Sequence, residues 1–281
     1  MWLAELLILS TALAAQVPAG HGGPGSELIR EATQLDLEGS GADARQLLQR
    51  AIDSAATPAA RTNAQRAMAM SWAFDGNCKK TSEYEQMVID YWVTKEKEQP
   101  HNAFYQEGEM ADEAARVCID SGDLDSAVQW YKQGHELGLK EPDISEDRKA
   151  LWEYRWEHAE ARIAARRNDR RAAERHVAAA KAALDSMKEL RQQQESFFPY
   201  LTGYVAFYLG DYEKALADLQ KADQRDPFIQ CLLGQTYEKL GDKDKAMECY
   251  RNASMTHAHN PPAAYARPFA RKKLPCCNEG S

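Results

Sequence analysis

The feature that most constrains the fold is a pattern of small and large residues that occurs twice in succession, at residues 201–227 and 232–253. In each copy a glycine sits among large apolar residues, a Gly-Asp pair follows, and an alanine comes shortly after that pair. Small residues at these places allow two antiparallel helices to approach closely, and Gly-Asp ends one helix and starts the next. The large residues at helical spacing then fill the seam, so the pattern predicts two consecutive helical hairpins.

Weaker copies of the same pattern lie upstream. They centre on Ala127 and Ala173, and two degenerate copies centre on Ala44 and Thr81. Together the copies predict six hairpins over residues 26–256. The residues to which we assign a structural role in the repeats are Ala127, Ala173, Gly203, Gly210, Ala215, Pro227, Gly234, Gly241 and Ala246.

These residues resemble the tetratricopeptide repeat, and the copy at 197–227 matches its pattern nearly whole. The resemblance implies an all-α superhelical solenoid of antiparallel helix hairpins. Equivalent positions are 31 to 46 residues apart here, against about 34 in the family. The middle units must therefore carry longer helices or longer connections, and a Sel1-like repeat remains an alternative there.

The two ends of the chain differ from the body. Residues 1–15 hold a short apolar stretch that ends in small residues, which is typical of a signal peptide and predicts export to the periplasm or the exterior. The alternative is a cytoplasmic protein in which this stretch packs under the first repeat. We expect a flexible linker at 16–25, a capping helix at 257–273 and a disordered tail at 274–281.

Composition narrows the possible functions. The formal net charge of -8 argues against nucleic acid as the main partner, and no apolar run after the signal segment is long enough to span a membrane. None of the phosphate-binding, dinucleotide-binding, zinc-protease or hydrolase motifs occurs, so we predict a protein that is not an enzyme and needs no cofactor. His257 and His259 have no identifiable third ligand, so no metal site is expected.

A partner-binding groove is predicted on the concave face, which the first helix of each hairpin lines. An aromatic stripe in the fifth unit borders a basic stripe in the fourth, and such side chains suit a partner segment with apolar and acidic residues. The alternative is that the aromatic residues pack on the neighbouring repeat and the basic ones are solvated. The candidate groove residues are Arg155, His158, Arg162, Arg166, Phe197, Tyr200, Tyr204, Tyr208 and Lys239.

The six cysteines leave two states open. Cys78 and Cys118 are expected on adjacent antiparallel helices, so they are candidates for a disulfide; the alternative, which the residues favour, is two buried free thiols. Cys231 and Cys249 are a second candidate pair.

The function that these observations favour is a scaffold or adaptor that captures a protein partner on the concave face. Two alternatives remain. In the first, the repeats would support an enzyme activity or belong to an accessory subunit of an enzyme. In the second, the repeats would self-assemble by stacking their ends, which exposed Phe269 and Leu274 would favour.

Overall fold

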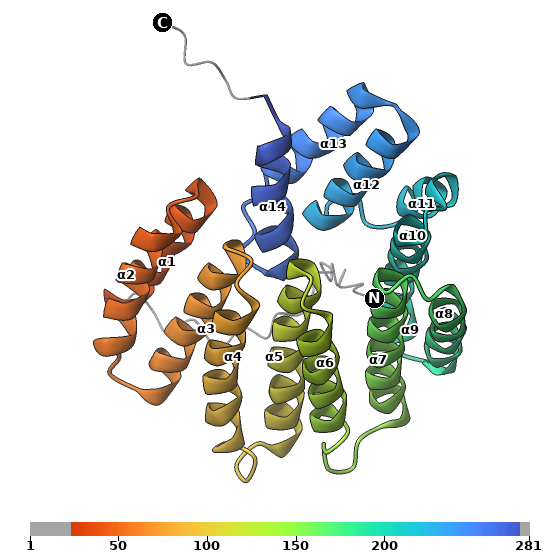
Figure 1. The fold of residues 1–281 in the computed structure, drawn as a ribbon. Coiled ribbons are helices and arrows are strands. Elements are labelled where there is room, and N and C mark those ends of the chain that lie inside the picture. The colour runs from red at the N-terminus through yellow and green to blue at the C-terminus, as the bar shows by residue number, and fades with distance from the viewer. Residues whose placement is uncertain (1–23, 276–281) are drawn as a thin grey trace, which may run out of the picture.

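The computed structural model describes residues 24–275. In this part of the chain the helices follow one another as antiparallel hairpins that form a curved solenoid (Figure 1). The paired helices are α1 (Pro24–Glu38) with α2 (Gly41–Asp53), α3 (Pro58–Phe74) with α4 (Cys78–Val93), α5 (Pro100–Ser121) with α6 (Leu124–Gly138), α7 (Glu146–Arg166) with α8 (Arg170–Ser186), α10 (Phe198–Tyr208) with α11 (Tyr212–Leu219), and α12 (Pro227–Leu240) with α13 (Lys243–Ser254).

Three further elements complete the chain. The short helices α9 (Arg191–Gln194) and η1 (Glu195–Phe197) connect the fourth hairpin to the fifth. Helix α14 (Pro261–Lys273) follows the last hairpin and lies within the segment where we expected a capping helix. Helix α1 begins at Pro24, so residues 24 and 25, which we predicted as linker, are helical instead. The predicted signal peptide lies outside the described residues, as does most of the predicted tail.

The repeat glycines and alanines lie at the seams of the hairpins. A Cβ atom at Gly203 would lie 2.6 Å from Cγ of Leu219, and one at Gly234 would lie 2.6 Å from Cε1 of Tyr250. Neither seam has room for a side chain, because the interior is close-packed. The alanines at the equivalent places in the second helices, Ala127, Ala173, Ala215 and Ala246, are also buried.

The Gly-Asp pairs turn the chain between helices. Gly241 has φ of +85°, a left-handed conformation that glycine adopts without steric cost. Asp242 then accepts a hydrogen bond from the backbone N–H of Lys245 (3.2 Å), which caps α13. Gly122 and Asp123 repeat this arrangement between α5 and α6. The local sequence thus fixes where each hairpin bends.

Longer first helices explain the wider spacing of the middle repeats. Helices α5 and α7 have 22 and 21 residues, whereas α10 and α12 have 11 and 14. The indole of Trp152 on α7 fills the extra interior and lies against Gly108 and Gly138, where a Cβ atom would overlap it. The irregular spacing therefore reflects extra helical turns around a large buried side chain.

A disulfide joins the second and third hairpins. The sulfur atoms of Cys78, at the start of α4, and Cys118, on α5, are bonded, and their Cα atoms lie 4.6 Å apart. Cys231 and Cys249 are buried free thiols, so the second candidate pair is wrong. Their side chains belong to different hydrophobic clusters.

Candidate functional site

Helix α14 lies against the inner side of the solenoid. It contacts α12 and α13 of the last hairpin and also α3 and α5 of the N-terminal half (Figure 1). Helices α3, α5 and α12 are first helices of their hairpins, which line the concave face of a solenoid. The C-terminal helix therefore occupies the place where we expected a partner.

Polar contacts hold this end of the chain to the first hairpin. The Nε2 atom of His259 donates to the buried carboxylate of Asp36 (2.9 Å), and the imidazole stacks on Phe74 with ring centroids 5.2 Å apart. The guanidinium of Arg267 donates to the backbone oxygens of Leu37 (2.8 Å) and Ser254 (2.6 Å). Residues from the two ends of the chain thus meet on the inner face.

The predicted aromatic stripe is buried rather than exposed in a groove. Tyr204 has none of its surface exposed and Tyr200 has 6%. The Tyr204 ring stacks on Phe228 of α12, and Phe228 in turn packs against Tyr265 of α14. The prediction of an accessible stripe is wrong for both tyrosines, because the next repeat and α14 cover them.

The predicted basic stripe is also engaged within the chain. Arg155 forms an ion pair with Glu109 (2.5 Å), and Arg166 donates to the hydroxyl of Tyr204 (3.5 Å). Arg162 and His158 are 5% and 8% exposed. These side chains lie between neighbouring repeats, where α7 faces α5 and α10, so the prediction that they face a partner is wrong for Arg162 and His158.

The remaining groove candidates are dispersed. Tyr208 is half-buried, and its hydroxyl accepts from Arg166 (3.4 Å). Phe197, in η1, is 40% exposed. Lys239 is exposed near the end of α12, and its ammonium lies 6.0 Å from the ring centroid of Tyr212. The structure therefore does not bring the nine candidates together on one surface.

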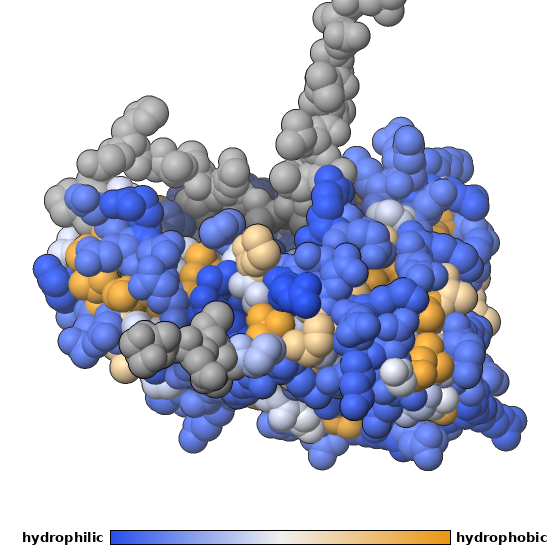
Figure 2. Space-filling model, turned by 90° about the horizontal axis from the view of Figure 1, so that it is seen from above, coloured by the Kyte–Doolittle hydropathy of each residue, from blue (hydrophilic) through white to orange (hydrophobic). Residues whose placement is uncertain are grey.

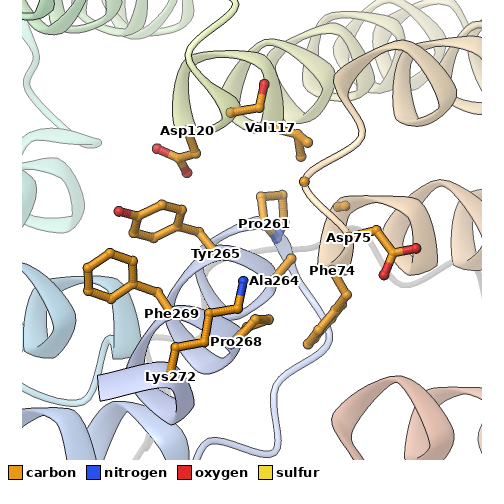
Figure 3. Close-up of a pocket in the computed structure, with 13 residues that line it drawn as sticks. Phe74, Asp75, Val117, Asp120, Pro261, Ala264, Tyr265, Pro268, Phe269 and Lys272 are labelled. Carbon is orange, nitrogen blue, oxygen red and sulfur yellow. The ribbon is translucent and has the colours of Figure 1, made fainter. Parts of the chain in front are cut away.

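A cavity of about 210 Å³ remains where α14 meets α3 and α5 (Figure 3). Figure 3 shows Phe74 on one side of it and Tyr265 and Phe269 on the other, with Val117 and Asp120 of α5 at its end. Apolar side chains dominate the lining. The residues that line it are Ala73, Phe74, Asp75, Gly76, Val117, Asp120, Ser121, Pro261, Ala264, Tyr265, Pro268, Phe269 and Lys272.

Three charged residues line this cavity. The carboxylate of Asp75 forms an ion pair with Arg45 (2.8 Å), and that of Asp120 forms one with Arg116 (3.0 Å). Burial raises the pKa of Asp120, and the nearby Arg116 lowers it in part. The ammonium of Lys272 is exposed and forms no ion pair with a described residue. Lys272 thus offers a positive charge beside an apolar cavity.

Sequence reasoning missed this cavity. Phe74 and Val117 belong to helical patterns that are typical of an ordinary core, and Lys272 lies within a basic run at the end of α14. The only signal was the segment at 257–273, which we expected to cover the last hairpin alone. His259, weighed as a metal ligand, instead pairs with Asp36.

Neither metal-binding clusters nor membrane spans are found in the described part of the chain. Residues 24–275 hold no group of three or more histidine, cysteine, aspartate or glutamate side chains placed to bind a metal ion. No helix in this range has the length and apolar character needed to cross a bilayer.

Comparison with known protein families defines the class of the last two hairpins. A family model described as a tetratricopeptide repeat matches residues 200–228 and 229–254, which cover α10 to α13. No curated protein matches the chain. The protein is therefore a helical repeat solenoid that contains tetratricopeptide repeats, a class of structure that points to protein–protein interaction.

Proposed function

We propose that the protein is a non-catalytic scaffold that captures a segment of a partner protein at the cavity between α3, α5 and α14. The single observation that carries this proposal is an apolar cavity on the inner side of a solenoid that contains tetratricopeptide repeats, bordered by Lys272, which has no ion-pair partner among the described residues. Binding sites are usually concave and mostly apolar, with a few polar groups that fix orientation.

The cavity suits one large apolar side chain of the partner. Its volume of about 210 Å³ accommodates a leucine or phenylalanine side chain, and Phe74 and Phe269 offer aromatic contacts. An acidic residue beside that anchor would pair with Lys272. The face shown in Figure 2 fits a local anchor, since hydrophobic side chains there form small separate groups among hydrophilic ones.

Selection from a displayed random peptide library tests this proposal. We expect the enriched peptides to share a large apolar residue next to an acidic one. The Ser121→Phe substitution places a ring at the exposed rim of the cavity, and Lys272→Glu reverses the free charge. Each change is expected to raise the Kd of a synthetic enriched peptide by at least about tenfold, which corresponds to the loss of one good contact.

Two matched variants serve as controls. Like Ser121, Ser186 is the last residue of a helix, and its hydroxyl donates to the backbone oxygen three residues earlier (2.7 Å). Ser186→Phe therefore makes the same substitution in a similar local setting away from the cavity. Lys97→Glu makes the same charge change in the loop after α4. If no peptide is enriched, or all four variants bind an enriched peptide equally, the cavity is not the capture site.

The two alternatives have less support. Phe269 is half-buried against Tyr250 and Tyr265, so this apolar surface is not free for stacking of solenoid ends. The match to the tetratricopeptide repeat, a generally non-catalytic family, supports a binding role over an enzyme activity. We also propose that the protein is exported, and the Cys78–Cys118 disulfide supports this because disulfides persist in oxidising compartments.

A further inference from the structure

Two arginines and a tyrosine lie together where α5, α7 and α10 meet; Arg162 and Tyr200 are buried and Arg116 is half-buried. Arg116 belongs to α5, Arg162 to α7 and Tyr200 to α10. The guanidinium of Arg116 lies 5.7 Å from the ring centroid of Tyr200. Both arginines are close enough to Tyr200 and to each other for their electrostatic interactions to matter.

Arg162 is buried and forms no ion pair within residues 24–275. It is 5% exposed, its Nη2 donates to the hydroxyl of Tyr131 (2.8 Å), and its Nε donates to the backbone oxygen of His158 (3.3 Å). Its Nη1 has no acceptor among the described residues. A buried guanidinium is ordinarily paired with a carboxylate, because removing the charge from water is costly.

Arg116 and Tyr200 each add an unsatisfied donor. The Nε of Arg116 donates to Asp120 (3.0 Å), and its guanidinium stacks on Phe228 at 4.2 Å, but within residues 24–275 its Nη2 has no acceptor. The buried hydroxyl of Tyr200 has no hydrogen-bond partner there either. Each buried donor left unpaired destabilises the fold, because it has lost its hydrogen bonds to water without replacing them.

The neighbouring charges leave an excess of positive charge. Arg166 is a third cation beside the cluster; it donates to tyrosine hydroxyls and, like Arg162, forms no ion pair with a described residue. Two acids interact with Arg116, Asp120 and Asp226; burial raises the pKa of both, and Asp226 also caps α12. Burial raises the pKa of Asp112 to about 8, so this group is mostly protonated at neutral pH.

The histidine beside the cluster adds no charge. Burial and the two guanidiniums lower the pKa of His158 well below its ordinary value, so the ring is neutral. Its centroid lies 5.5 Å from that of Tyr200. The positive charge at this point therefore comes from the arginines alone.

We propose that Arg116, Arg162 and Tyr200 form a binding site for a small oxyanion. One oxyanion supplies acceptors for all three unsatisfied donors and compensates the buried Arg162. Guanidinium groups match the oxygen geometry of phosphate, sulfate and carboxylate, and donors from three helices surround such an anion. Asp120, the ion-pair partner of Arg116, lines the cavity beside α14 (Figure 3), so the cluster lies next to that cavity. This site does not depend on peptide capture.

Thermal unfolding of the full chain with added anions tests the site. At matched ionic strength, inorganic phosphate, sulfate and acetate are compared with chloride; phosphate stands for a free tetrahedral anion and acetate for a carboxylate. We expect at least one oxyanion to raise the Tm by about 5 °C at a concentration about 100 times its Kd. Isothermal titration calorimetry then gives that Kd.

Variants of the site make the test specific. Tyr200→Phe removes only the hydroxyl and is expected to weaken oxyanion binding by about tenfold. Arg162→Lys removes the forked donor and is expected to abolish the Tm shift. Tyr250→Phe is the matched control, because it removes a buried hydroxyl from a different cluster. If no oxyanion stabilises the chain more than chloride, or if Tyr200→Phe and Tyr250→Phe bind it equally, the cluster is not an oxyanion site.

Discussion

At the scale of single residues, burial changes the pKa of a carboxylate on one of the first helices. Glu107 of α5 is fully buried, and neither of its carboxylate oxygens has a hydrogen-bond partner in residues 24–275. Burial, with a smaller contribution from Glu96, raises its pKa from 4.5 to about 7, and Lys140 opposes this shift. Between about pH 4.5 and pH 7, Glu107 is therefore protonated in the folded chain and ionised in the unfolded chain.

Glu107→Gln tests this proton linkage. Because the folded pKa is raised, the contribution of Glu107 to stability is fully present below about pH 4.5 and is lost as the pH rises to about 7. Relative to the glutamine variant, the natural chain should lose about 2 kcal/mol of unfolding free energy over this interval. Urea denaturation at pH 5, 6, 7 and 8 measures it. Glu189→Gln, at an exposed position, should show no such trend, and parallel curves for Glu107→Gln would contradict the buried state.

Gly138→Ala tests the packing of the long middle hairpins. A Cβ atom at this position would overlap the buried Trp152 ring, so we expect a loss of about 1–3 kcal/mol in unfolding free energy. Gly25→Ala is the control, because nothing lies within 4 Å of the added atom. Equal stability of the two variants would show that α6 and α7 do not approach as closely as described.

At the scale of elements, hydrogen bonds from one side chain attach α14 both to α1 and to the end of the last hairpin. Arg267 donates hydrogen bonds to backbone oxygens of Leu37, Ser254 and Thr256, so one side chain joins α14, the last hairpin and α1. Burial and the nearby Arg271 lower its pKa. This side chain is the main polar link between α14 and the first helix.

Arg267→Ala should detach α14 from the first hairpin. It leaves three partly buried carbonyls without this donor, for which we expect a cost of about 3 kcal/mol. The backbone amides of α14 should therefore exchange their hydrogens faster in this variant. Arg271→Ala, one turn further along at an exposed position, should leave exchange unchanged. Retention of slow exchange in Arg267→Ala would assign the attachment to apolar packing instead.

The hairpins could be predicted from the sequence, whereas the inner face could not. Gly234 and Tyr250 meet within one hairpin, so their spacing along the chain carries the information. Asp36 and His259 meet across almost the whole chain, and no local pattern records that contact. Tyr204 is buried because α12 and α14 cover it. The helical spacing of the aromatic residues predicted the face of α10 on which Tyr204 lies, but it could not predict whether that face is exposed.

At the scale of the whole molecule, α14 joins the two halves of the solenoid. An open solenoid has contacts only between neighbouring repeats, so its repeats unfold with limited cooperativity. Here α14 contacts α3 and α5 as well as α12 and α13, and the disulfide links two of the N-terminal hairpins. The N-terminal and C-terminal hairpins are therefore expected to unfold together.

Deletion of residues 257–281 should separate the two halves. We expect a larger radius of gyration by small-angle X-ray scattering, and urea unfolding in two transitions instead of one, because the long-range contacts of α14 are lost. Deletion of residues 276–281 alone leaves α14 intact and is the control. A truncated chain that keeps its radius and a single transition would mean that the hairpins alone set the curvature.

The contact between Asp36 and His259 also limits how this protein can change over evolutionary time. Repeat proteins commonly gain or lose units, because each added unit needs only its neighbours. In this chain, one unit more or fewer would rotate and shift the last hairpin, and α14 would no longer reach α3. The contacts of α14 with both halves of the solenoid thus constrain the number of hairpins. Natural variants are expected to differ in loop length or surface residues more readily than in repeat number.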